Sequence, residues 1–139
     1  MGNSLACSGV ALTVASVYEC TGFRLPTAGE WEYAARAGTR TTFYSGNYAP
    51  GSTYGTTVNG DEPMLDSVAW YHGTSKNFSQ PVGQKLSNGW GLYDVLGNAF
   101  EWVFDEQRAQ GYGAQQVADP GGELVQVTAR QVRGEGHEL

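Results

Sequence analysis

Glycine is the residue that most constrains how this chain can fold. The sequence holds 20 glycines among 139 residues, roughly twice the usual proportion, and they follow no Gly-X-Y period or repeat. Four Trp, eight Tyr and five Phe supply enough large side chains for a core. The combination predicts one domain rich in turns and irregular loops and held by aromatics, rather than a helical bundle or a disordered segment.

The charge balance excludes two classes of partner. The formal net charge is −6, with only eight Lys and Arg residues scattered along the chain. Nucleic acid and anionic membranes both require a concentrated basic surface, so neither is expected. No apolar run approaches the roughly 20 residues of a membrane span. The start of the chain lacks the basic residues of a secretory signal, which favours the cytoplasm as written.

Two cysteines leave the redox compartment open. Cys7 and Cys20 flank an alternating run, 10–14, that predicts a strand. A turn after it would make a hairpin over residues 7–20 with the cysteines opposite each other. A disulfide there would add about 3 kcal/mol of stability and would favour a periplasmic or secreted protein. The alternative is two free thiols in a reducing cytoplasm.

One segment carries the full signature of a helix, over residues 26–38. Thr27 and Glu30 have the spacing of a capping box, and Gly38 stands where a left-handed C-terminal residue is expected. Helical spacing places the apolar face at Trp31, Ala34 and Ala35.

The remaining segments are less regular. Residues 39–67 are dense in turn formers. "SVAWYHG" predicts an extended piece packed on the core, and residues 88–104 predict a Gly-rich turn, one helical turn and a strand at 99–104. "LVQVTARQVRG" is a last strand-like piece. Four aromatic residues are predicted to fill the core, and a platform that stacks on a sugar or peptide is the less favoured interpretation. They are Trp70, Tyr71, Trp90 and Tyr93.

Motifs for familiar catalysis are missing from the sequence. His72 and His137 are isolated from other ligand types, and no zinc, iron, P-loop or dinucleotide pattern occurs. Asp94 and Glu101 instead flank a tight Gly97-Asn98 turn in "LYDVLGNAFEW". Calcium combines carboxylates with backbone carbonyls, so a calcium site is one interpretation. The other is a turn whose carboxylates cap nearby N–H groups.

Four ordered motifs resemble the sulfatase-modifying-factor, or formylglycine-generating-enzyme, family. They are "GFRLPTAGEWEYAARAGT", "SVAWYHG", "QPVGQKLSNGWGLYDVLGNAFEWV" and "RQVRG", which together cover most of residues 20–134. The resemblance implies a single domain over 1–139 with an α+β fold of the C-type-lectin-like kind and little regular secondary structure. It also implies that this domain is incomplete at both ends, with a metal-site segment at 88–104 and a divergent tail at 106–139.

The resemblance implies a calcium site at the motif "LYDVLGNAFEW". The ligands would be the side chains of Asp94 and Glu101 and the backbone carbonyls of Gly97 and Ala99. A second calcium site of some members has no counterpart, because Thr74 stands near the expected aspartate.

The resemblance also bears on catalysis. Copper-binding cysteines of the true enzymes lie in a C-terminal core, and no match to them follows the "EW" motif here. We therefore expect a non-catalytic, calcium-stabilised structural or ligand-binding module, without copper, iron or nucleotide. The alternative is a copper-dependent oxidase that converts a sulfatase cysteine to formylglycine and is completed by a partner chain.

A homodimer is the expected assembly. The absent parts of the family domain would bare apolar surface and strand edges, both of which are uncommon on soluble monomers. A second copy of the chain could cover them with two-fold symmetry. The ligand of such a module is not indicated by the sequence.

Overall fold

The computed structural model describes residues 17–19, 21–47, 63–106 and 130–134. Cys7, Cys20 and the hairpin expected between them lie outside the described residues, as does most of the tail after residue 106. The elements in chain order are the 3-10 helix η1 (Val17–Glu19), the helices α1 (Ala28–Arg36), α2 (Pro63–Asp66) and α3 (His72–Ser75), and the strands β1 (Glu101–Glu106) and β2 (Arg130–Arg133).

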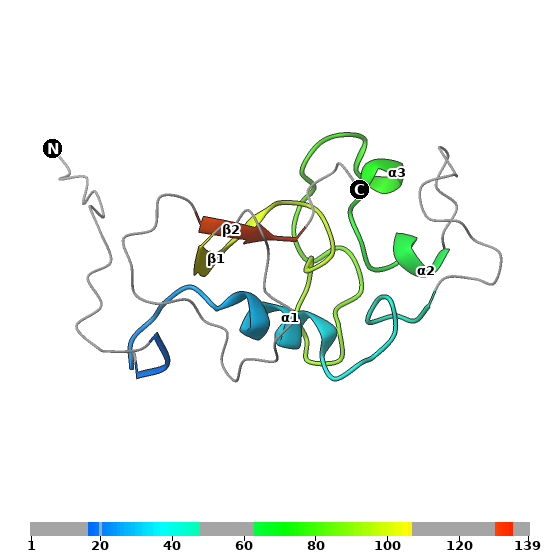
Figure 1. Ribbon diagram of the computed structural model, residues 1–139. Coiled ribbons are helices and arrows are strands. Elements are labelled where there is room, and N and C mark those ends of the chain that lie inside the picture. The colour runs from blue at the N-terminus through cyan, green and yellow to red at the C-terminus, as the bar shows by residue number, and fades with distance from the viewer. Residues whose placement is uncertain (1–16, 20, 48–62, 107–129, 135–139) are drawn as a thin grey trace, which may run out of the picture.

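The elements form a small α+β structure in which turns outnumber helices and strands. β1 and β2 pair antiparallel, and α1 packs against both strands, while α2 and α3 lie at the far end of the molecule (Figure 1). The predicted α+β fold with little regular secondary structure is confirmed. No helix in the described part of the chain has the length and apolar character needed to cross a membrane.

The start of α1 is the capping box that the sequence predicts. The Thr27 hydroxyl accepts a hydrogen bond from the Glu30 amide at 3.2 Å, and the Glu30 carboxylate accepts one from the Thr27 amide at 2.8 Å. Two hydrogen bonds from Arg24, at 2.6 and 2.7 Å, hold the same carboxylate. They are the main reason that the Glu30 pKa falls to about 2, so this group stays ionised and paired near neutral pH.

The observed helix is shorter than the predicted range 26–38. Its left-handed C-cap is Ala37, with φ of 48°, one residue before the expected Gly38. The buried residues of the helix are Ala28 and Ala35, whereas Trp31 is half-buried. Trp31 therefore belongs to the wall of a surface cavity rather than to the centre of the core.

Strand β1 is fastened to the beginning of α1. The buried Asp105 carboxylate accepts a hydrogen bond from the Ala28 amide at 2.6 Å, and the Phe104 amide donates to the Pro26 carbonyl at 2.7 Å. A carboxylate at a helix N-terminus satisfies a free N–H group and complements the helix dipole. The strand thus caps the helix from outside its own sequence.

The pairing of β1 with β2 contains a bulge. Glu101 lies opposite Arg133 and Trp102 opposite Val132, but the register shifts before Glu106. A regular strand alternates between its two faces, yet residues 103–105 are all buried. The register irregularity accounts for this run, since a bulge turns an additional residue toward the same side.

An apolar cluster lies around α2 and the residues that follow it. Its buried members are Leu65, Val68, Ala69 and Tyr71. The prediction that "SVAWYHG" packs on the core is confirmed, but the expected extended piece is limited to its middle, because Ser67 and Val68 lie in a turn and α3 begins at His72. The core role predicted for all four aromatics is wrong for Trp90 and Tyr93, which are 50% and 52% exposed.

The glycine-rich turn near Asn88 forms as predicted, but the helical turn after it does not. The Asn88 side chain organises this segment. Its oxygen accepts hydrogen bonds from the amides of Trp90 and Leu92, both at 3.0 Å. Its nitrogen donates to the last-turn carbonyls of Ala34 and Ala35 at 2.8 and 3.0 Å. The Asn88 side chain therefore closes the turn and attaches it to the end of α1.

Candidate functional site

The loop that carries the predicted metal ligands is held by the backbone of Trp70. The Trp70 amide donates to the Leu96 carbonyl at 3.1 Å, and the Trp70 carbonyl accepts from the Asn98 amide at 2.9 Å. Gly97 lies between these two bonds with φ of +86°, and a Cβ atom there would meet the Trp70 oxygen at 1.9 Å. Only glycine fits this contact.

Asn98 fixes the next loop beside the first. Its side chain accepts a hydrogen bond from the Gln80 amide at 2.8 Å and donates to the Gln80 carbonyl at 3.1 Å, so it pairs with the backbone as a strand would. Asn98 is buried and has φ of +67°, a conformation that asparagine tolerates better than most residues. Gly83, three residues after Gln80, donates a hydrogen bond from its amide to the Asp94 carboxylate at 2.6 Å.

These loops enclose a cavity of about 360 Å³ that contains three of the four predicted metal-site residues. Its lining residues are Val82, Gly83, Tyr93, Asp94, Asn98, Ala99 and Glu101. Gly97 is not among them. Its carbonyl accepts a hydrogen bond from the Ala99 amide at 2.9 Å, and it lines a second cavity instead. Asn98 was not among the site residues predicted from the sequence, but it also lines the smaller cavity.

The two carboxylates in this cavity differ in their surroundings. Oδ1 of Asp94 is buried and receives no hydrogen bond from the described residues, while its other oxygen is held by Gly83. The exposed Glu101 accepts a hydrogen bond from the Trp31 indole nitrogen at 2.6 Å. A buried carboxylate oxygen without a donor is costly unless a cation or water satisfies it. The donor set therefore fits a hard cation that accepts oxygen ligands.

Other metal chemistry has less support. The described residues contain no group of three or more His, Cys, Asp and Glu side chains placed to share an ion. Thr74 serves the local fold, since its hydroxyl donates to the Ala69 carbonyl at 3.0 Å and accepts from the Tyr71 amide at 3.2 Å. His72 is an exposed residue at the beginning of α3. Cys7, Cys20 and His137 lie outside the described residues.

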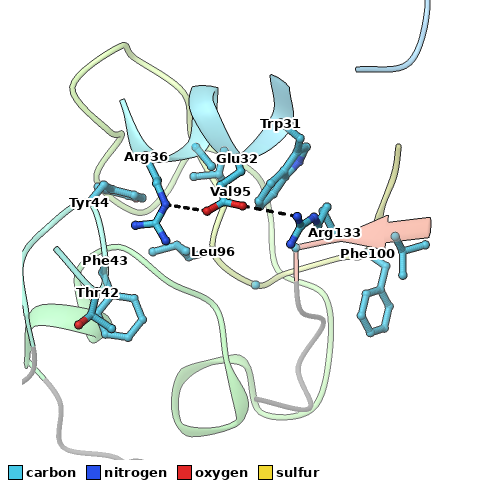
Figure 2. Close-up of a pocket in the computed structure, with 14 residues that line it drawn as sticks. Trp31, Glu32, Arg36, Thr42, Phe43, Tyr44, Val95, Leu96, Phe100 and Arg133 are labelled. Carbon is cyan, nitrogen blue, oxygen red and sulfur yellow. Dashed lines mark hydrogen bonds and ion pairs between the residues drawn. The ribbon is translucent and has the colours of Figure 1, made fainter. Parts of the chain in front are cut away.

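A larger cavity, of about 580 Å³, includes Trp31 and Gly134 in its lining. Figure 2 shows Glu32 between two guanidinium groups, with Arg36 at 2.9 Å and Arg133 at 3.5 Å. Glu32 and Arg36 are four residues apart on one helix, a spacing visible in the sequence. Arg133 comes from β2, and no sequence signal indicated that it would join them.

The motifs, the α+β fold and the loop fastened at Gly97 together define a domain of the formylglycine-generating-enzyme class. The family model described as "Sulfatase-modifying factor enzyme 1-like domain" matches residues 4–138. The chain therefore belongs to this family.

Curated relatives carry the same family name. The chain is 42% identical to the formylglycine-generating enzyme of Mycobacterium tuberculosis over 88 residues, which cover 61% of this chain and 28% of that protein. It is 37% identical to the bovine "Inactive C-alpha-formylglycine-generating enzyme 2" over 91 residues, covering 63% of this chain and 28% of the relative. One further match has another name, "Chaperone protein LppX" of Paenibacillus barcinonensis, at 38% identity over 88 residues. Across eight curated matches the chain spans 24% to 38% of the relative's length.

A solved structure supports the fold. Treponema denticola variable protein 1 superposes with a TM-score of 0.63 and 31% sequence identity, over 84% of this chain and 37% of the other. The similarity extends over most of the chain, so the fold assignment does not depend on the short motifs alone.

Proposed function

We propose that this chain is a non-catalytic, calcium-stabilised module of the formylglycine-generating-enzyme family with a structural or ligand-binding role. The observation that supports calcium is the buried Oδ1 of Asp94, which receives no hydrogen bond from the described residues and belongs to a residue that lines the same cavity as Glu101. Calcium prefers carboxylate and carbonyl oxygens. The carbonyl of Ala99 would join them, and that of Gly97 keeps a second lone pair beyond its bond to the Ala99 amide.

The role of the ion would be to connect two parts of the chain. Asp94 lies in the loop before the Gly97 turn, and Glu101 begins β1. Glu101 also holds the Trp31 indole of α1. A shared cation would offset the repulsion between the two carboxylates and fix the loop to the strand and the helix.

Calcium is expected to raise the melting temperature of the protein. An ion that binds only the native state stabilises it by about 2.7 kcal/mol at a concentration 100 times its Kd. Glu101→Gln should remove most of that effect. The glutamine retains an oxygen that can accept the hydrogen bond from Trp31, so the variant tests the charge more than the packing. Thermal unfolding followed by circular dichroism, with calcium or with a chelator, measures the difference.

Glu19 offers the matched control, because it is an exposed glutamate of η1 far from the cavity in sequence. Glu19→Gln should retain the full response to calcium. Magnesium, which demands a more rigid octahedral site, should stabilise less. Melting curves that coincide in calcium and in chelator would disprove the calcium proposal.

The proposed absence of catalysis rests on the cysteines. The sequence contains only Cys7 and Cys20, and both precede α1 rather than follow the β1 segment. We expect no formylglycine when the protein is incubated with copper, oxygen and a cysteine-containing sulfatase peptide and the products are analysed by mass spectrometry. The Mycobacterium tuberculosis relative serves as the positive control. Formation of the aldehyde, and its loss in Cys20→Ser, would establish the oxidase alternative.

A further inference from the structure

We propose that the larger cavity binds a small organic monocarboxylate with an apolar body. Its volume of about 580 Å³ lies within the range of known ligand pockets. Most of its walls are apolar, and these walls include Phe43, Val95, Leu96, Phe100 and Val132. The charged side chains of the lining converge at one place, where Glu32 lies between Arg36 and Arg133 (Figure 2).

The charge at that place selects a monoanion. Two guanidinium groups face one carboxylate, which leaves an excess of one positive charge in a chain whose formal net charge is −6. The Tyr44 hydroxyl adds no charge, because it donates to the carbonyls of Val68 and Leu86 and burial raises its pKa further above neutral, to about 12. The nearby Glu101 carboxylate is bonded to Trp31 and lines the smaller cavity. One additional carboxylate therefore balances the excess, whereas a phosphate dianion would exceed it.

Arg133 provides the specific contact. Its ion pair with Glu32 is long, at 3.5 Å, compared with about 2.7–2.9 Å for a strong charge-assisted hydrogen bond. Its Nε atom is buried and finds no acceptor among the described residues. A guanidinium group offers Nε and a neighbouring Nη as a fork that matches the two oxygens of a carboxylate. A ligand carboxylate in the cavity would pair with the guanidinium group that Glu32 holds only at 3.5 Å, and a turn of the Arg133 side chain would bring the buried Nε within its reach.

Glu32 acts in this arrangement as an internal competitor. It occupies the same guanidinium groups that the ligand needs, and its negative charge repels the ligand's. Removal of the Glu32 charge should therefore strengthen binding, while removal of the Arg133 charge should weaken it. Opposite changes in ligand affinity on substitution of the two residues of one ion pair distinguish a binding site from a purely structural salt bridge.

The test is an isothermal titration of the full chain with 3-phenylpropionate, with its neutral amide as the comparison ligand. We expect saturable one-to-one binding of the acid and at least tenfold weaker binding of the amide. Arg133→Gln should weaken acid binding at least tenfold, and Glu32→Gln should tighten it severalfold. Arg40→Gln, which removes an exposed arginine that does not line the cavity, should leave the affinity unchanged.

Three outcomes would overturn the proposal. They are equal affinity of the wild-type protein for acid and amide, weaker acid binding by Glu32→Gln, and no binding of the acid at millimolar concentration. Circular dichroism checks that each variant is folded. If Arg133→Gln does not fold, the acid–amide comparison in the wild type and in Glu32→Gln still decides the result.

Discussion

Gly97→Ala is expected to destabilise the protein by about 4 kcal/mol, a large part of the stability of a typical domain. The new Cβ would lie 1.9 Å from the Trp70 carbonyl oxygen, in a residue with φ of +86°. Left-handed backbone costs a non-glycine residue roughly 1–2 kcal/mol, and a forced shift in a packed region costs roughly 1–3 kcal/mol more. Both hydrogen bonds of Trp70 to the loop would also be strained. Urea unfolding measures the change.

Two other glycines separate these contributions. Gly91 has φ of +79° and no atom within 4 Å of its would-be Cβ, so Gly91→Ala should show only the backbone cost of about 1–2 kcal/mol. Gly29 lies in the first turn of α1 with open space around it, and Gly29→Ala should stabilise the protein by up to about 1 kcal/mol. If Gly97→Ala is as mild as Gly91→Ala, the contact with Trp70 does not determine the fold of the loop.

Asn98→Ala is expected to cost about 2–4 kcal/mol and to reduce the response to calcium. The substitution removes both side-chain bonds to the Gln80 backbone, and each polar group left without a partner costs about 1–3 kcal/mol. The loop that positions Gly83 against Asp94 would then lose its attachment. Chemical unfolding and the calcium-dependent melting shift report the two effects separately.

Asn77 is the control for backbone strain at this position. It has φ of +63° but is exposed, so Asn77→Ala should cost about 1 kcal/mol. Asn98→Asp keeps an acceptor for the Gln80 amide but loses the donor to its carbonyl, and its stability should lie between those of the wild type and Asn98→Ala. Equal losses in Asn98→Ala and Asn77→Ala would show that the bonds to Gln80 contribute little.

The parts of this protein that could be predicted from sequence are those set by neighbouring residues. The capping box joins Thr27 to Glu30, and its two partners are always within reach of each other. The turn at Asn88 is likewise built from local amides. The family motifs led to Asp94, Ala99 and Glu101, which do line one cavity. Whether they hold calcium stays a prediction.

The errors share one cause, which is that distant contacts outweighed local preference. The expected helical turn near residue 95 is absent because the Leu96 carbonyl and the Asn98 amide bond to Trp70. Trp90 is one of the aromatics predicted to fill the core, yet it packs at the surface on Tyr33, with ring centroids 4.9 Å apart. A large aromatic residue predicts burial only when enough of the fold surrounds it.

The sequence by itself determined the family, the capping box of α1 and a fold dominated by glycine-rich turns, because these depend on composition and on residues close together in the chain. Only the tertiary structure decided which groups from distant parts of the chain come into contact. Arg133 reaches Glu32 over 101 positions and Asp105 reaches Ala28 over 77. The reason is physical. A hydrogen bond or ion pair forms where packing brings two groups within about 3 Å, and for distant residues that proximity depends on how the whole chain folds.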